Sequence, residues 1–257
     1  MHVLLLSLCL GTQGVQEPAT LRGGAWLPRL GGTITDGGGA IDYETNIDMR
    51  DREVLPLLEF QVEPIDDIVV ALFFFDFSTS GNGTFVGGDT YGGMVMTNGD
   101  AWSASTDIQS VSMEAAWEVW EPYKSGDDDT LSFAPVVGLQ WFGVKTNLTN
   151  VTNTQSRDHQ NSWIALQGGL QMDFRWDASG ENSPLNSIGI QGQVMAGAMM
   201  GGDGGGMVSI QAGLSLGFTE SASAFFGYRL QELSADDGAY TFDAGLQGLF
   251  VGAEIRF

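Results

Sequence analysis

Apolar residues recur at every second position through most of this chain. In residues 166–176 they alternate with small or polar residues, and residues 208–218 repeat the pattern. A period of two is that of a β-strand with one apolar and one polar face, whereas an amphipathic helix has a period of 3.6 residues. No apolar run reaches the roughly 18 residues that a transmembrane helix needs. The sequence therefore predicts an all-β fold.

Ten segments follow this alternation, and connectors of two lengths separate them. The segments are residues 24–34, 54–63, 68–79, 101–122, 131–146, 161–176, 187–199, 207–219, 222–231 and 245–257. The connectors 35–53, 80–100, 147–160 and 232–244 are long, 64–67, 123–130 and 220–221 are short, and 177–186 and 200–206 fit this alternation less well. Alternating long loops and short turns are typical of an antiparallel barrel in a membrane. We expect a single antiparallel up-and-down transmembrane β-barrel of about 10 strands. Eight or 12 strands are the alternatives, because segment 101–122 is about twice the roughly 9 to 11 residues that one crossing needs.

The net charge of −22 argues against one class of partner. Ten basic residues stand against 32 acidic ones, and the basic residues are not clustered as phosphate binding requires. We therefore expect no nucleic-acid partner, whereas a divalent cation would be attracted to the chain. The apolar share of 43% is too high for a disordered acidic chain.

The first residues have the outline of a secretory signal peptide. An apolar run from Val3 to Leu10 precedes Gly11-Thr12-Gln13-Gly14, which offers small residues at positions −3 and −1 for cleavage after Gly14. The positively charged segment that normally opens such a peptide is missing, so residues 1–14 are expected to be an incomplete signal peptide. The only cysteine, Cys9, lies in it, and the barrel domain over residues 15–257 is then expected to contain no disulfide.

Alternation alone leaves open which face points outward, because a soluble lipocalin-like binding barrel has the same period. The polar faces carry glutamines, carboxylates and arginines with almost no lysine, a set that can pair inside a narrow lumen. The charged residues expected to line that lumen are Glu59, Glu63, Asp76, Glu114, Glu118, Asp173, Arg175, Arg229, Glu254 and Arg256. Aromatic residues near strand ends suit an interfacial girdle: Trp26, Trp102, Trp120, Tyr123, Trp163, Trp176, Tyr228 and Phe257. We therefore expect the apolar faces to contact lipid.

The last segment ends in an aromatic residue preceded by apolar residues at every second position. The alternating residues are Leu249, Val251, Ala253, Ile255 and Phe257. This strand resembles the carboxy-terminal signature of bacterial outer-membrane β-barrel proteins, although an aromatic residue is common where Ile255 stands. The resemblance implies an outer-membrane location, contact with outer-membrane lipid and recognition by the barrel assembly machinery.

A catalytic set at the outer rim is one hypothesis from the residues. His159 is the only histidine beyond the expected signal peptide, and Asp158, Ser156 and Ser162 lie near it in a predicted outer loop. No nucleophile motif surrounds either serine, and adjacent residues of an extended chain point to opposite faces. We therefore expect no enzymatic activity and interpret His159 as a solvated loop histidine.

Acidic connectors are the candidates for metal binding. Asp42, Glu44, Asp48, Asp236 and Asp237 could offer oxygen ligands to divalent cations, but their spacing is not that of a calcium loop. No cofactor is expected. The functional expectation is a small barrel with a narrow or plugged polar lumen and a structural or surface role. A narrow cation-preferring channel for small solutes and the soluble binding barrel remain as alternatives.

Overall fold

The fold was taken from a computed structural model, which describes residues 19–49, 51–125, 129–180 and 183–257. The predicted signal peptide and Cys9 lie outside these residues. Every regular element in the described ranges is a β-strand, as predicted. In the same ranges, no helix is long and apolar enough to cross a membrane.

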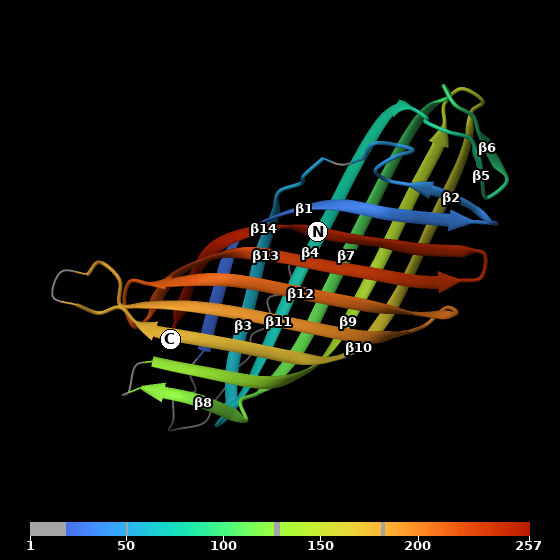
Figure 1. Cartoon of the computed structure of the whole chain (residues 1–257). Helices are drawn as coiled ribbons and strands as arrows, with labels where there is room; N and C mark the ends of the chain where they lie inside the picture. Colours follow the sequence, from blue (N-terminus) through green and yellow to red (C-terminus); the bar gives the residue numbers. More distant parts are fainter. Residues whose placement is uncertain (1–18, 50, 126–128, 181–182) are drawn as a thin grey trace.

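Ten antiparallel strands close into a barrel, which confirms the predicted fold (Figure 1). They are β1 (Ala19–Asp36), β3 (Leu55–Ile65), β4 (Ile68–Thr84), β7 (Ala101–Trp117), β9 (Asp129–Asn150), β10 (Gln155–Asp177), β11 (Ser187–Met200), β12 (Gly204–Gly217), β13 (Ala222–Asp237) and β14 (Tyr240–Arg256). Each pairs with the next along the chain, and β14 pairs with β1 from Thr20↔Arg256 to Asp36↔Tyr240, which closes the ring. The first and last strands therefore start and finish at one end of the barrel. We name this the periplasmic end and the opposite one the outer end.

The strands continue further toward the outer end than the alternation predicted. Residues 147–160 and 232–244, predicted as long loops, are mostly paired strand joined by the short turns 151–154 and 238–239. Antiparallel pairing needs only backbone groups, so polar residues can extend a hairpin beyond the lipid. At 22 and 23 residues, β9 and β10 are about twice as long as one crossing requires.

Four short strands are added to the ring. β2 (Gly39–Asp42) pairs with β1, and β5 (Asp89–Tyr91) pairs with β6 (Met94–Met96) above the outer end. β8 (Trp120–Ser125) pairs with β9 at the periplasmic end, beyond the point where β7 stops. The predicted single strand over 101–122 is therefore interrupted after Trp117 rather than continuous.

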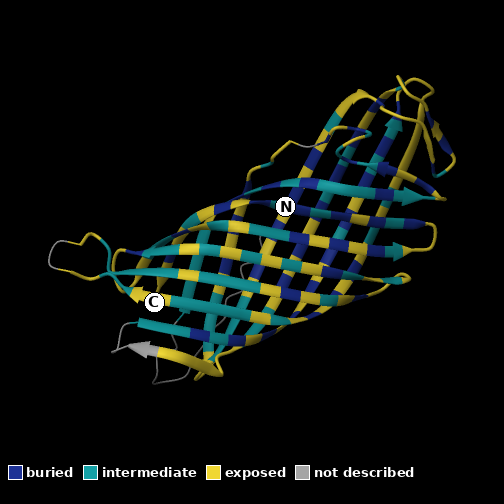
Figure 2. Cartoon of the chain, viewed as in Figure 1, coloured by how far each residue is buried: buried dark blue, intermediate teal, exposed yellow. Residues whose placement is uncertain are grey.

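Buried and exposed residues alternate along the strands (Figure 2). Leu170, Val208 and Leu214 are 51%, 38% and 37% exposed on the outer surface. The apolar faces therefore point outward, as predicted. The soluble alternative, in which these apolar faces line a pocket, is wrong because they lie on the outer surface of the barrel.

The aromatic girdle was predicted only partly in the right place. Trp117, Trp120 and Trp176 are exposed on the outer surface near the periplasmic end, where the Trp120 ring stacks on Phe133 at 5.1 Å. By contrast, three of the tryptophans predicted for the girdle are buried inside the barrel. They are Trp26, Trp102 and Trp163. Each occupies an inward-facing position of its strand, so proximity to a strand end did not indicate lipid contact.

The interior has two distinct halves. Toward the outer end, inward side chains pack into a buried cluster that we call the apolar plug. Its wall residues are Trp26, Leu30, Ile34, Phe75, Phe77, Ile108, Phe142, Val144, Trp163, Phe242 and Leu246. Residues of the outer connectors and short strands cover the plug: Tyr43, Ile47, Phe85, Tyr91, Met94 and Met96. The half toward the periplasmic end is polar and hollow. A soluble ligand could enter the lumen from this end.

Candidate functional site: a polar cavity at the periplasmic end

The hollow half of the lumen is a cavity of about 530 Å³. A small recess of about 40 Å³ shares part of its lining, including Arg22, Glu59 and Arg229. Four of the chain's ten basic residues line the cavity, although the whole chain carries a net charge of −22. Six carboxylates face them across the same space: Glu59, Glu63, Glu118, Asp173, Glu220 and Glu254. Both signs of charge are therefore gathered in a volume typical of small-ligand pockets.

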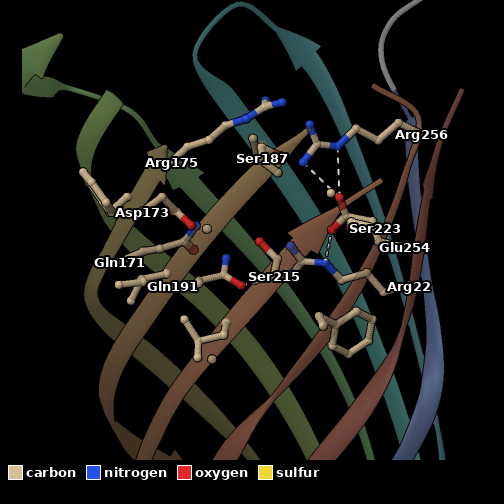
Figure 3. Close-up of a pocket in the computed structure, with 18 of the residues that line it drawn as sticks. Arg22, Gln171, Asp173, Arg175, Ser187, Gln191, Ser215, Ser223, Glu254 and Arg256 are labelled. Atoms are coloured by element: carbon tan, nitrogen blue, oxygen red, sulfur yellow. Dashed lines mark hydrogen bonds and ion pairs between the residues drawn. The ribbon is translucent and has the colours of Figure 1, made fainter. Parts of the chain in front are cut away.

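Arg22 and Glu254 form the centre of an ionic network on one wall (Figure 3). Arg22 on β1 donates through Nε to Glu254 on β14 at 2.7 Å and through Nη1 to Glu59 on β3 at 3.2 Å. Arg256 contacts the other oxygen of Glu254, with Nη2 at 2.9 Å. The same Nη1 of Arg22 also donates to the side-chain oxygen of Gln191 at 3.2 Å. Charges on three strands next to the β1–β14 seam therefore satisfy one another.

Arg229 is held differently. Its Nε donates to the side-chain oxygen of Gln211 at 2.7 Å, and its guanidinium lies over the Phe73 ring at 4.1 Å from the centroid. In the described ranges, no carboxylate forms an ion pair with it. A guanidinium over an aromatic face gains a cation–π attraction, which partly offsets the lost water. Its charge is therefore directed into the cavity without an anionic partner in contact.

Side-chain amides also line the lumen and bind its carboxylates. Gln171 donates to Asp173 at 2.6 Å, and Gln193 donates to Glu114 at 2.9 Å. These amides satisfy carboxylates without adding a counter-charge. These residues occupy positions that the alternation in the sequence predicts to lie on the polar faces of their strands.

Nine of the ten charged residues expected in the lumen line the cavity or its recess. Asp76 does not, and that prediction is wrong. It is exposed on the outer surface, where its carboxylate accepts a hydrogen bond from Gln109 at 3.4 Å. Its neighbours Phe75 and Phe77 face inward instead. Because both faces of β4 are apolar here, the alternation did not indicate whether Asp76 faces the lumen or the outside.

His159 lies in strand β10 and faces the interior, so its predicted position in a loop is wrong. Its Nε2 atom is 2.8 Å from Oδ2 of Asp36, at the outer end of β1. The imidazole stacks on the Tyr240 ring with 4.3 Å between centroids, and the Tyr91 ring meets it edge-on at 6.1 Å. Asp36 was not predicted as a partner of His159, because the two residues are 123 positions apart in the sequence.

The serine and aspartate residues near His159 in sequence do not join it. Ser156, Asp158 and Ser162 are exposed on the opposite face of β10. Ser156 instead contacts the Thr149 hydroxyl of β9 at 3.0 Å. The catalytic set considered from the sequence is therefore not assembled by these residues.

The acidic connectors take part in local hydrogen bonding. Oδ1 of Asp42 accepts hydrogen bonds from the backbone N–H groups of Glu44 and Thr45, at 2.9 and 2.6 Å. Glu44 faces Arg29 at 3.8 Å, and Asp236 accepts from the Thr241 hydroxyl at 2.7 Å. Asp48 and Asp237 complete the candidate set. Over the part of the chain that the structure describes, no group of three or more His, Cys, Asp or Glu side chains could hold a metal ion.

The outer surface decides the class of the protein. Large apolar side chains are exposed over the strands of the ring, and the lumen is polar or plugged. A closed barrel with this distribution satisfies its backbone internally and presents hydrocarbon to lipid, as bacterial outer-membrane barrels do. The chain is a membrane-spanning β-barrel of the outer-membrane type. The residues of the carboxy-terminal signature, Leu249 to Phe257 at alternate positions, all lie on this lipid-facing side.

Comparison with solved structures returned several barrels of bacterial origin. OmpT, an outer-membrane protease from Escherichia coli, is 7% identical, with a TM-score of 0.49 and coverage of 96% of this chain and 99% of OmpT. Ail, the attachment invasion locus protein of Yersinia pestis, is 12% identical, with a TM-score of 0.39 and coverage of 95% and 100%. The toluene transporter TodX of Pseudomonas putida is 9% identical, with a TM-score of 0.31 and coverage of 95% and 89%. None of these similarities assigns an activity or a ligand to this chain. No family model and no curated protein sequence matches it.

Proposed function

We propose that this barrel is a non-conducting outer-membrane protein with a structural and cell-surface role. The observation that carries the proposal is the apolar plug. Its wall side chains come from strands all around the ring, and Phe77 and Phe142 are fully buried within it. A packed core dominated by apolar side chains offers a hydrated ion little to replace its water, so it is a barrier to conduction.

The outer end provides the surface for this role. The β9–β10 hairpin extends well beyond the length that one crossing requires, and its outward face at that end is polar, with Ser156, Asp158 and Gln160 exposed. Polar strand faces beyond the lipid are suited to contact with surface sugars or with other proteins. We further propose that the carboxy-terminal strand is read by the barrel assembly machinery and that the acidic connectors attract divalent cations.

A cation-preferring channel is the competing function. The carboxylates of the lower lumen favour it, because Glu63 and Glu118 line a cavity that cations could enter. The apolar plug opposes it, because buried apolar side chains occupy the outer half of the lumen. The two functions therefore differ in one measurable property, which is ion flow through the folded barrel.

Planar-bilayer recording tests the proposal. Folded wild-type protein, with insertion verified by heat-modifiable gel migration, should give no stepwise current. A variant that empties the plug (Trp26→Ala, Phe77→Ala and Phe142→Ala together) should gain current steps. Phe74→Ala, on the lipid face of the same β4 strand, is the matched control and should stay silent. Cation-selective steps from the wild-type protein would refute the non-conducting role and support the channel.

A further inference from the structure

Arg229 is a deeply buried cation of the cavity whose terminal nitrogens have no hydrogen-bond acceptor among the described residues. Of its three guanidinium nitrogens, Nε has an acceptor in Gln211, while Nη1 and Nη2 have none among the residues that the structure describes. Arg22 differs, since Glu59, Glu254 and Gln191 surround it. Arg229 lines both the cavity and the recess. Glu59 and Glu114 line the recess with it and attract its charge, but neither forms an ion pair with it among the described residues.

A ligand carboxylate fits the terminal nitrogens of Arg229. The guanidinium presents parallel N–H groups, and a carboxylate accepts from two of them at once. Glu59 and Glu114 offset part of the Arg229 charge without contacting its terminal nitrogens, whereas an anionic ligand group would pair with these nitrogens directly. Gln211 and Phe73 hold the guanidinium from one edge and one face, so it is oriented before any ligand arrives.

Carboxylates elsewhere in the cavity decide what else the ligand must carry. Glu254 forms ion pairs with Arg22 and Arg256. Asp173 accepts a hydrogen bond from the neutral amide of Gln171 and interacts with Arg22 only at longer range, without an ion pair among the described residues. Figure 3 shows Asp173 and Gln171 on the wall opposite Arg22 and Glu254. Glu118 lines the same space. A purely anionic ligand would be repelled by these groups, whereas an ammonium group would be attracted to them.

We propose that this cavity binds a small zwitterion, of the class of amino acids and short peptides, that enters from the periplasmic end. Its carboxylate pairs with Arg229, and its ammonium group is received by Asp173 and Glu118. The cavity volume of about 530 Å³ lies within the range of pockets that enclose ligands of this size. Hydroxyls of Ser132, Ser187 and Ser215 line the wall and can bind the peptide group. The proposal goes beyond a structural role and is independent of conduction.

Isothermal titration calorimetry with purified, folded barrel and the dipeptide Lys-Ala tests this site. Wild-type protein should bind saturably. Arg229→Gln should weaken binding by about tenfold or more, as expected for the loss of a charge-assisted pair. The amidated dipeptide, which lacks the carboxylate, should bind the wild-type protein equally weakly and should lose no further affinity in the variant.

Matched variants separate the two ends of the ligand. Asp173→Asn should weaken binding of Lys-Ala but should not change the affinity of a dipeptide whose amino groups are acetylated. Arg157→Gln removes an arginine of the outer end, outside the cavity lining, and should bind like the wild type. Arg229→Lys keeps the charge for folding but loses the fork, so it should remain folded and bind weakly. The proposal is overturned if wild-type protein shows no saturable binding at millimolar dipeptide, or if folded Arg229→Gln binds Lys-Ala as tightly as the wild type.

Discussion

Two neighbouring phenylalanines on β4 test whether one face of this strand packs in the apolar plug while the other contacts lipid. Phe75 is 1% exposed inside the apolar plug, and Phe74, the next residue, is 48% exposed toward lipid. The Phe75 ring also meets Trp26 edge-on with 5.4 Å between centroids. Phe75→Ala leaves a hole among packed side chains, and such changes in protein cores cost about 3–5 kcal/mol. The edge-on pair accounts for roughly 0.5–1.5 kcal/mol of that loss.

Phe74→Ala removes the same atoms at nearly the same depth but opens no hole, because mobile lipid chains fill the space. Its cost is then the transfer term alone, about 1.5–3 kcal/mol. Reversible urea unfolding in lipid vesicles, followed by tryptophan fluorescence, measures both losses of unfolding free energy. The expected order is a larger loss for Phe75→Ala, by about 1–2 kcal/mol, which corresponds to the cavity contribution. Equal losses, or a larger loss for Phe74→Ala, would refute the assignment of a dry packed interior to the outer half.

Two further predictions concern closure of the ring and the outer connectors. A Cβ at Gly248 would clash with the backbone oxygen of Leu27, so Gly248→Ala should prevent β14 from closing on β1 and abolish the heat-modifiable folded band. Gly23→Ala, with open space around its Cβ, should fold normally. The backbone N–H of Thr97 and the side-chain amide of Asn150 donate to Asp100 and lower the pKa of its carboxyl group. These contacts should therefore be complete above the ordinary aspartate range and lost as the pH falls through the lowered pKa. An NMR titration of the Asn150 side-chain amide should show this low midpoint; a midpoint at or above the ordinary aspartate value would contradict it.

The strand content of this barrel was open to prediction because lipid and lumen impose opposite demands on alternate residues. Wherever both demands act, as at Leu170 beside Gln171, the alternation is clear and the strand was found. The strand count, the antiparallel order and the outward direction of the apolar faces all follow from such pairs.

Where the demands do not differ, the sequence was silent. In β4, Phe73 and Phe75 face the interior and Phe74 faces lipid, so both faces are apolar and the position of Asp76 was misjudged. The same loss of contrast concealed the plug. At the outer end both faces are polar, so the paired residues of the β9–β10 hairpin were predicted as a loop.

The charged groups of the cavity were found by residue type, but their partners were not. Arg22 was absent from the predicted lumen set because it precedes the first predicted strand segment, although it lies at the centre of the ionic network. His159 and Asp36 meet through the closure of the ring, which brings strands β1 and β10 together at the outer end. Pairings that depend on ring closure leave no local signal in a single sequence.

The obstruction in this barrel is built from the wall itself, with side chains such as Leu30, Phe142 and Phe242 contributed by separate strands. Exchange of the connectors above it should therefore leave the permeability barrier of the cell intact, which would suit the scaffold to display of foreign peptides. A leak to antibiotics would need several simultaneous substitutions spread over the ring. Gradual mutation is thus a difficult route from this protein to a pore.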